Sequence, residues 1–206
     1  MEKNFNIGNF VEFAGCTLCG VPKCMPGVEE DRKVCPHYEH FKSVNITDNY
    51  VAFWGGVFSN FYPCKITHHG HEFRSSEQLF MYSKALFFGD EETTAEILKA
   101  KTPKEAKALG RKVKDFNDEA WNEVKETLMY GAVYQKFKQN TELCRYLINP
   151  VTETRHFVEG SPIDKVWGVG ISWDDPAIAD EKNWKGENLL GKTLDKVRRA
   201  LIEEKQ

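Results

Sequence analysis

A glutamate and a lysine lie seven residues apart in the stretch SSEQLFMYSKA, residues 75–85. Apolar residues surround them at helical spacing, and at about 100° per residue Glu77 and Lys84 share one helix face, two turns apart. A buried salt bridge here would add little stability, because desolvation offsets most of the attraction. A desolvated lysine with a lowered pKa is instead a good amine nucleophile, and a nearby carboxylate can move protons. We interpret the pair as a candidate catalytic site, with the salt bridge as the alternative.

A second stretch, SPIDKVWGVGISW at residues 161–173, combines Asp164 with a tryptophan that is followed by glycines. Gly168 and Gly170 allow close approach of the backbone, and an exposed Trp167 would offer a stacking surface for a base. The glycine spacing does not match a dinucleotide-binding fingerprint. The alternative is a core tryptophan beside a tight turn.

Four cysteines follow the spacing C-x2-C-x4-C-x10-C, and Gly20 directly after the second lets backbone amides turn toward a thiolate-bound metal. Four thiolates suit a closed, structural zinc site, whereas a [4Fe–4S] cluster and a set of free thiols are the alternatives. His37 and His40 are substitute ligands. We assign this site no catalysis and expect no cofactor for the reaction itself. The predicted ligands are Cys16, Cys19, Cys24 and Cys35.

Residues 99–114, KAKTPKEAKALGRKVK, carry seven cations against one anion. In a chain of net charge −3 this is a local positive patch that suits phosphates, and the alternative is an ordinary solvated helix face. The three histidines of THHGH, residues 67–71, are predicted to form a solvated hairpin tip. A turn between them keeps two of them from pointing the same way.

Caps and turns indicate the elements that must position these residues. Strands are predicted at YVAFW, at FSNFYP, in a hairpin that turns at residues 69–70, and at RHFVEG. Capping residues and apolar periodicity predict helices that begin near Ser75, Thr102, Asn117 or Asp118, Thr141 and Asn188. We therefore expect a mainly helical α+β domain with a small antiparallel sheet over residues 46–206, after a Cys-rich segment over residues 1–45.

Composition limits the class of protein. The chain has 206 residues, 41% of them hydrophobic and 29% charged, which is typical of a globular domain rather than a disordered chain. The net charge of −3 argues against a globally basic nucleic-acid binder. No apolar run approaches the roughly 18 to 20 residues that span a bilayer, and the first residues lack a secretion pattern. We expect a soluble, cytoplasmic protein with no membrane partner.

Six blocks of sequence, in this order, resemble the NADAR family, also called YbiA-like. The resemblance covers about residues 50–202. The blocks are FSNFYP (58–63), SSEQLFMYSKA (75–85), TPKEAKALGR (102–111), WNEVKETLMYGAVYQKF (121–137), FVEGSPIDKVWGVG (157–170) and WKGENLLGKTLDKVR (184–198).

The resemblance implies a compact, mainly helical α+β fold and an N-glycosidase. Some members remove ADP-ribose from guanine in nucleic acid, as antitoxins to a guanine-modifying ADP-ribosyltransferase toxin. Relatives in riboflavin metabolism cleave phosphoribosylamino-pyrimidine intermediates. We expect the first activity, with ADP-ribosylated nucleic acid or nucleoside as the partner. The second activity and a non-catalytic module that binds ADP-ribose or another NAD derivative are the alternatives.

The resemblance also assigns roles to residues. Lys84 would capture the ring-opened ribose as a Schiff base or serve only as a cation. Glu77 would shuttle the proton or else orient the ribose hydroxyls, and Asp164 would hold ribose or act as a second acid. Met81 stands where many members have glutamine, and the N-terminal cysteines lie outside the resemblance. The predicted substrate-binding residues are Phe58, Ser59, Asn60, Trp167, Gly168, Arg111 and Asn188.

Overall fold

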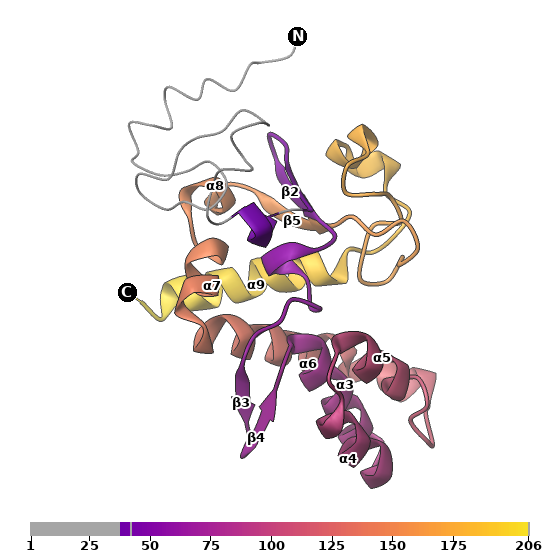
Figure 1. Ribbon diagram of the computed structural model, residues 1–206. Coiled ribbons are helices and arrows are strands. Elements are labelled where there is room, and N and C mark those ends of the chain that lie inside the picture. The colour runs from indigo at the N-terminus through magenta and orange to yellow at the C-terminus, as the bar shows by residue number, and fades with distance from the viewer. Residues whose placement is uncertain (1–37, 42, 206) are drawn as a thin grey trace.

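The computed structural model describes residues 38–41 and 43–205 (Figure 1). The predicted metal ligands Cys16, Cys19, Cys24 and Cys35 lie outside the described residues. Within these residues, no three His, Cys, Asp or Glu side chains gather in an arrangement that could hold a metal ion. Nor does any described helix combine the length and the apolar character that a membrane span requires.

The larger of the two sheets in the described residues has three strands. It contains β1 (Val44–Ile46), β2 (Tyr50–Phe53) and β5 (His156–Glu159), in the order β1-β2-β5. β1 and β2 are antiparallel, whereas β2 and β5 are parallel, so the prediction of a purely antiparallel sheet was wrong. The reason is that β5 returns to the sheet after a long helical excursion, a connection that permits parallel pairing.

The predicted hairpin is confirmed, but the predicted strand before it is not. β3 (Ile66–His68) and β4 (His71–Phe73) pair across a turn in which both central residues have positive φ. FSNFYP (58–63) instead begins at the last residue of a short 3-10 turn, η2 (Gly56–Phe58), and continues as a loop. The carbonyl groups of this turn and loop bind a side chain rather than a strand, because Lys136 Nζ donates to the carbonyl oxygens of Val57 and Ser59 at 2.7 and 2.8 Å.

Helices are the main element of the described residues, and three of the predicted helix caps are confirmed, whereas the Asp90 cap of α4 was not predicted and Asn188 makes no side-chain cap bond. Ser75 accepts a hydrogen bond from the Gln78 N–H, Thr102 from the Glu105 N–H, and Asn117 from the Ala120 N–H. The helices are α3 (Ser76–Phe87), α4 (Glu91–Lys99), α5 (Pro103–Gly110), α6 (Asp118–Gln139), α7 (Thr141–Leu147), α8 (Pro150–Glu153) and α9 (Leu189–Glu203). Three further 3-10 turns are η1 (Tyr38–Phe41), η3 (Pro176–Ala179) and η4 (Glu181–Asn183).

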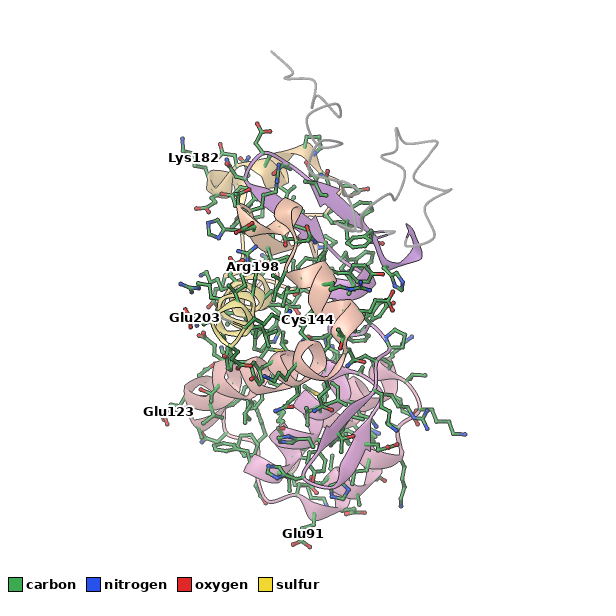
Figure 2. The ribbon with its side chains drawn as sticks, turned by 90° about the vertical axis from the view of Figure 1, so that its left-hand side faces the viewer. Glu91, Glu123, Cys144, Lys182, Arg198 and Glu203 are labelled. Atoms are coloured by element: carbon green, nitrogen blue, oxygen red, sulfur yellow. The ribbon has the colours of Figure 1, made fainter. Side chains whose placement is uncertain are left out.

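The elements are stacked in layers. α9 packs against β5 on one side and against α6 on the other, and α3 packs against α4, α5 and α6 (Figure 1). Seen from the side, the sheet, α9, α6 and the α3–α5 group follow one another along the molecule (Figure 2). Aromatic residues such as Phe58 and Phe157 fill the core between the layers. The loops that leave β2 and β5 therefore meet the α3–α5 group.

Candidate active site

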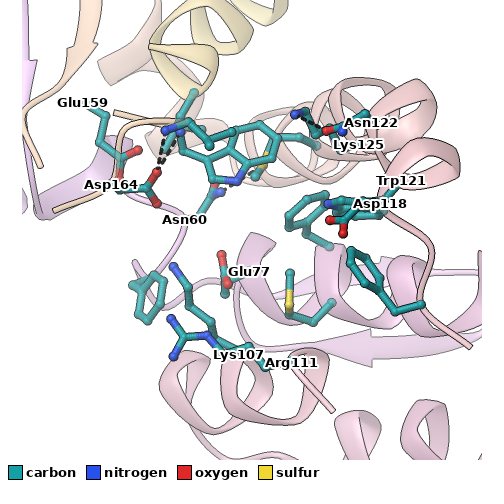
Figure 3. A pocket seen from close by; sticks show the side chains of 18 residues that line it. Asn60, Glu77, Lys107, Arg111, Asp118, Trp121, Asn122, Lys125, Glu159 and Asp164 are labelled. Carbon is teal, nitrogen blue, oxygen red and sulfur yellow. Dashed lines mark hydrogen bonds between the residues drawn. The ribbon is translucent and has the colours of Figure 1, made fainter. Parts of the chain in front are cut away.

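A cavity of about 410 Å³ opens where these loops meet α3, α5 and α6 (Figure 3). Its walls combine carboxyl groups, cations and aromatic rings from segments far apart in the sequence. It is lined by Asn60, Phe61, Glu77, Phe80, Met81, Lys107, Arg111, Phe116, Asp118, Trp121, Asn122, Lys125, Met129, Glu159, Asp164, Val166, Trp167 and Leu190.

Glu77 faces this cavity from the first turn of α3. The Ser75 cap fixes the start of the helix, and the Glu77 N–H donates to the carbonyl of Asn60 at 3.1 Å. The side chain is only 4% exposed, and this burial raises the pKa of the carboxyl to about 7. Lys107 and Arg111 lower that pKa, whereas Asp164 raises it. Both protonation states of Glu77 are therefore accessible near neutral pH, as a proton shuttle requires.

Lys84 does not line the cavity. Lys84 and Glu77 share a helix face, but seven residues of helix correspond to about 10 Å of axial rise, and this rise separates the two side chains along α3. Lys84 Nζ donates to the carbonyl of Gly110 at 3.0 Å and lies 4.1 Å from the ring centroid of Phe116. A second cavity-wall ring, that of Trp121, lies 5.2 Å away. Burial lowers the pKa of this lysine, but its amine binds the end of α5.

Two of the described lysines line the cavity, Lys107 on α5 and Lys125 on α6, and the Lys125 amine donates to Asn122 Oδ1 at 2.6 Å. Lys107 lines the wall opposite Asp164, and its charge is the largest stabilising influence on the Glu77 carboxylate (Figure 3). Its Nζ also lies 5.4 Å from the ring centroid of Phe61. In the sequence this residue was one cation of the 99–114 patch. The available signal was its spacing from Arg111, which places both on one face of α5.

Glu159 is a site residue that the sequence analysis missed. It ends β5, and its Oε2 is buried without a hydrogen-bond partner. Burial raises the pKa of its carboxyl to about 8, and the negative charge of Asp164 adds to this rise. An unpartnered buried carboxylate is costly, so the neutral acid is favoured at neutral pH. The only sequence signal was a glutamate at the end of an otherwise apolar strand.

Asp164 and Trp167 form one unit beside Glu159. The Asp164 Oδ1 accepts hydrogen bonds from the N–H groups of Val166 and Trp167, at 3.0 and 2.9 Å. Trp167 lines the cavity and meets the ring of Phe80 edge-on, with centroids 5.4 Å apart. The aspartate thus holds the turn that presents the indole, while its other oxygen is not used in these two bonds.

The remaining predicted substrate-binding residues divide into two groups. Asn60 and Arg111 line the cavity, and Ser59 lines an adjoining groove. Phe58 instead packs in the core against Phe157 at a centroid distance of 4.7 Å, because its side chain points away from the loop.

Gly168 and Asn188 do not line the cavity wall, and both contact the backbone of β5 instead. A β-carbon on Gly168 would lie 2.7 Å from the Glu159 carbonyl, so glycine permits close packing there. Asn188 Oδ1 accepts from the Glu159 N–H at 3.0 Å, and its Nδ2 donates to the Phe157 carbonyl at 2.9 Å. Asn188 therefore fixes the end of β5 that carries Glu159.

This arrangement suits a nucleotide-like ligand. Trp121, Trp167 and Phe80 offer aromatic surfaces, and Arg111 and Lys125 offer positive charge for phosphates. The carboxyl groups of Glu77 and Glu159 can donate or accept a proton near neutral pH.

Comparison with known families agrees with the blocks noted in the sequence. The model of the NADAR domain matches residues 52–202. The chain belongs to the NADAR family. It is 38% identical to protein irg-1 of Caenorhabditis elegans, over 80% of this chain and 85% of that protein. It is 36% identical to N-glycosidase R617 of Acanthamoeba polyphaga mimivirus, over 74% of this chain and 96% of that protein.

A solved structure of the family shares this fold. The NMR structure of the Escherichia coli protein YbiA superimposes with a TM-score of 0.63 at 30% identity, over 81% of this chain and 93% of that chain. The mainly helical, YbiA-like architecture expected from the sequence is therefore confirmed.

Proposed function

We propose that this NADAR chain is an N-glycosidase that hydrolyses the ribose–nitrogen bond of ADP-ribosylated guanine in DNA. One observation carries the proposal: Glu77, Glu159 and Asp164 meet Lys107 in a single aromatic cavity. Breaking an N-glycosidic bond requires protonation of the departing nitrogen and stabilisation of charge at the anomeric carbon. The relative R617, named an N-glycosidase, supports the same reaction class.

The surroundings of the two buried glutamates suggest their roles, because Glu159 has an unpartnered carboxyl oxygen that favours the neutral acid, whereas Lys107 and Arg111 favour the Glu77 carboxylate. Glu159, with a pKa of about 8, is the acid that protonates the departing base. Glu77, with a pKa of about 7, is the base that takes a proton from the attacking group. Two carboxyl groups whose environments separate their pKa values commonly divide these tasks.

Lys107 is the proposed nucleophile in place of Lys84, because its side chain lines the cavity and its charge acts on Glu77, whereas the Lys125 amine binds Asn122. Its amine attacks the anomeric carbon, and the bond from that carbon to the base breaks with its electron pair leaving on the base nitrogen. The lysine nitrogen is now bonded to the anomeric carbon. The bond from that carbon to the ring oxygen then breaks, the ring oxygen takes a proton, and the carbon–nitrogen bond becomes an imine, which water hydrolyses to ADP-ribose and the free amine. In a direct reaction, water would attack instead and Lys107 would act as a cation.

The rest of the cavity suits the ADP part of the substrate. Trp121 and Trp167 offer stacking surfaces for adenine, and Arg111 and Lys125 line the same cavity and offer positive charge for the phosphates. The Asp164 oxygen that does not bind the turn is the proposed acceptor of a hydrogen bond from a ribose hydroxyl, because Asp164 lines the cavity.

The test is release of ADP-ribose and unmodified guanine from guanine-ADP-ribosylated DNA, followed by chromatography and mass spectrometry. We expect release by the native chain and a loss of about 100-fold or more in Lys107→Met. Release only from a phosphoribosylamino-pyrimidine would assign the riboflavin-type reaction instead. Binding of ADP-ribose without turnover of either substrate would favour a binding module and overturn the proposal.

A further inference from the structure

A wide groove of about 1140 Å³ adjoins the cavity on the side of Phe61. The two spaces are continuous, because they share six wall residues. These are Phe61, Lys107, Arg111, Glu159, Asp164 and Val166. The groove therefore adjoins the proposed reaction centre, and Trp121 and Trp167, the rings that suit adenine, do not line it.

The groove gathers exposed hydrophobic side chains. In the described part of the chain seven large hydrophobic residues are exposed, and four of them line this groove. Trp54, directly after β2, is 52% exposed, and Phe61 is 38% exposed. Ile163 is 86% and Val166 38% exposed. Such a cluster on one concave surface is typical of a binding site rather than of scattered surface residues.

The groove is also cationic. Lys104, Lys107 and Arg111 follow one another on a single face of α5, and Lys165 reaches the groove from the loop after β5. No ion pair among residues 38–41 and 43–205 engages any of the four, whereas Lys114 of the same basic stretch pairs with Glu92 at 2.6 Å. Of the two acids in the wall, Glu159 is favoured in its neutral form and Asp164 is held by backbone N–H groups. The groove thus attracts anions.

We propose that this groove binds the nucleotides that flank the modified guanine in a single-stranded nucleic acid. The inference rests on the proposed function: the proposed nucleophile Lys107 and acid Glu159 line both spaces, so the guanine would lie where cavity and groove meet. Bases of a single strand stack on exposed aromatic rings such as Trp54, while lysines beside them bind the phosphates. A single strand fits better than a duplex, because the modified base must be unpaired to reach the buried carboxyl groups.

The experiment compares one linkage in two contexts. ADP-ribosylated guanine is supplied within a single-stranded oligonucleotide and as the free nucleoside, and kcat/KM is measured for both. The quantity compared is kcat/KM for the oligonucleotide divided by kcat/KM for the nucleoside. We expect Trp54→Ala and the double variant Lys104→Ala/Lys165→Ala each to lower this ratio by about 10-fold. The matched controls are Phe87→Ala, an aromatic residue 44% exposed outside the groove, and Lys112→Ala, an exposed lysine of the same basic stretch.

The outcomes separate the two proposals. A ratio that stays at the control value in both groove variants would overturn the strand-binding groove while leaving the glycosidase intact. Equal losses on both substrates would overturn it too, because the groove would then serve the cavity alone. If the native chain cleaves neither substrate, fluorescence anisotropy with an unmodified single-stranded oligonucleotide still tests the groove. Binding that is weakened by the groove variants alone supports it, and equal binding by all variants overturns it.

Discussion

Lys84 of α3 donates a hydrogen bond of 3.0 Å to the carbonyl of Gly110, the last residue of α5. A lysine in this place satisfies a carbonyl that the helix leaves free and complements the negative end of the helix dipole. The bond ties the helix that carries Glu77 to the helix that carries Lys107. Lys84 is therefore suited to positioning the site, and Lys107 to the chemistry.

The first prediction separates these two lysines. Borohydride reduction during turnover should trap an adduct of ribose on Lys107, and peptide mass mapping should find it there. Lys84→Met should lower the free energy of unfolding by about 1–2 kcal/mol through the lost charged hydrogen bond, yet still form the adduct. Lys107→Met should form none. An adduct on Lys84 would contradict the assignment.

The second prediction concerns the close approach of α3 and α5. A β-carbon on Gly110 would lie 2.2 Å from the Sδ of Met81. Gly110→Ala should therefore destabilise the fold by about 1–3 kcal/mol, as overpacking does. Denaturant unfolding of Gly110→Ala, Met81→Ala and the double variant checks this. The two changes should be coupled favourably, because the shortened side chain at position 81 leaves room for the new methyl group. Additive effects would show that the contact is not the cause.

The third prediction concerns activity against pH. If Glu77 acts as a base and Glu159 as an acid, kcat/KM should rise through a pH of about 7 and fall through about 8. Glu159→Gln should remove the alkaline limb and slow the reaction by about 100-fold. A matched control is Glu187→Gln, an exposed glutamate in the loop before α9 that lines neither the cavity nor the groove. An alkaline limb that persists in Glu159→Gln would assign the acid elsewhere.

The same carboxyl also makes stability depend on pH. The folded pKa of Glu159 is raised from an ordinary 4.5 to about 8, so the folded chain holds a proton that the unfolded chain releases. Its contribution to stability is therefore full below pH 4.5 and is lost as the pH rises to about 8. For one group, the free energy of unfolding falls by at most about 1.4 kcal/mol per pH unit. Glu159→Gln should flatten this fall in a series of denaturant titrations, and an unchanged slope would refute the buried acid.

The fourth prediction concerns Lys136, which is fully buried on α6 and binds the carbonyl groups of Val57 and Ser59. Lys136→Met leaves the Val57 carbonyl unpaired and the Ser59 carbonyl with the Tyr62 N–H alone, and it should destabilise the chain by about 2–4 kcal/mol. It should also raise KM, because the loop it holds leads to Asn60 in the cavity wall. Lys138→Met, which removes only a surface pair with Glu204, is the matched control and should change little.

Burial lowers the pKa of Lys136 to about 8, from an ordinary 10.5. The folded chain therefore gives up this proton more readily than the unfolded chain, and stability should rise as the pH goes from about 8 to 10.5. Lys136→Met should lack that rise. A rise that is equal in the native chain and the variant would show that another group is responsible.

The sequence by itself determined those features that depend on residues close together in the chain. The caps at Ser75, Thr102 and Asn117 depend on contacts within a few residues, and so does the hairpin turn at residues 69–70. The placement of Glu77 at a buried helix start follows from the same local pattern. Family blocks spread along the chain then identified the NADAR domain over most of its length.

Only the tertiary structure decided which residues share the cavity. Residues 77, 107 and 159 come from α3, α5 and β5, and no periodicity relates them. Lys107 looked like one cation among seven until packing turned its face of α5 toward the site. Lys84 shares a helix face with Glu77, but the axial rise carries its amine to Gly110 instead. Glu159 gained its raised pKa from burial beside Asp164, and burial is set by the whole fold rather than by the neighbours of a residue in sequence.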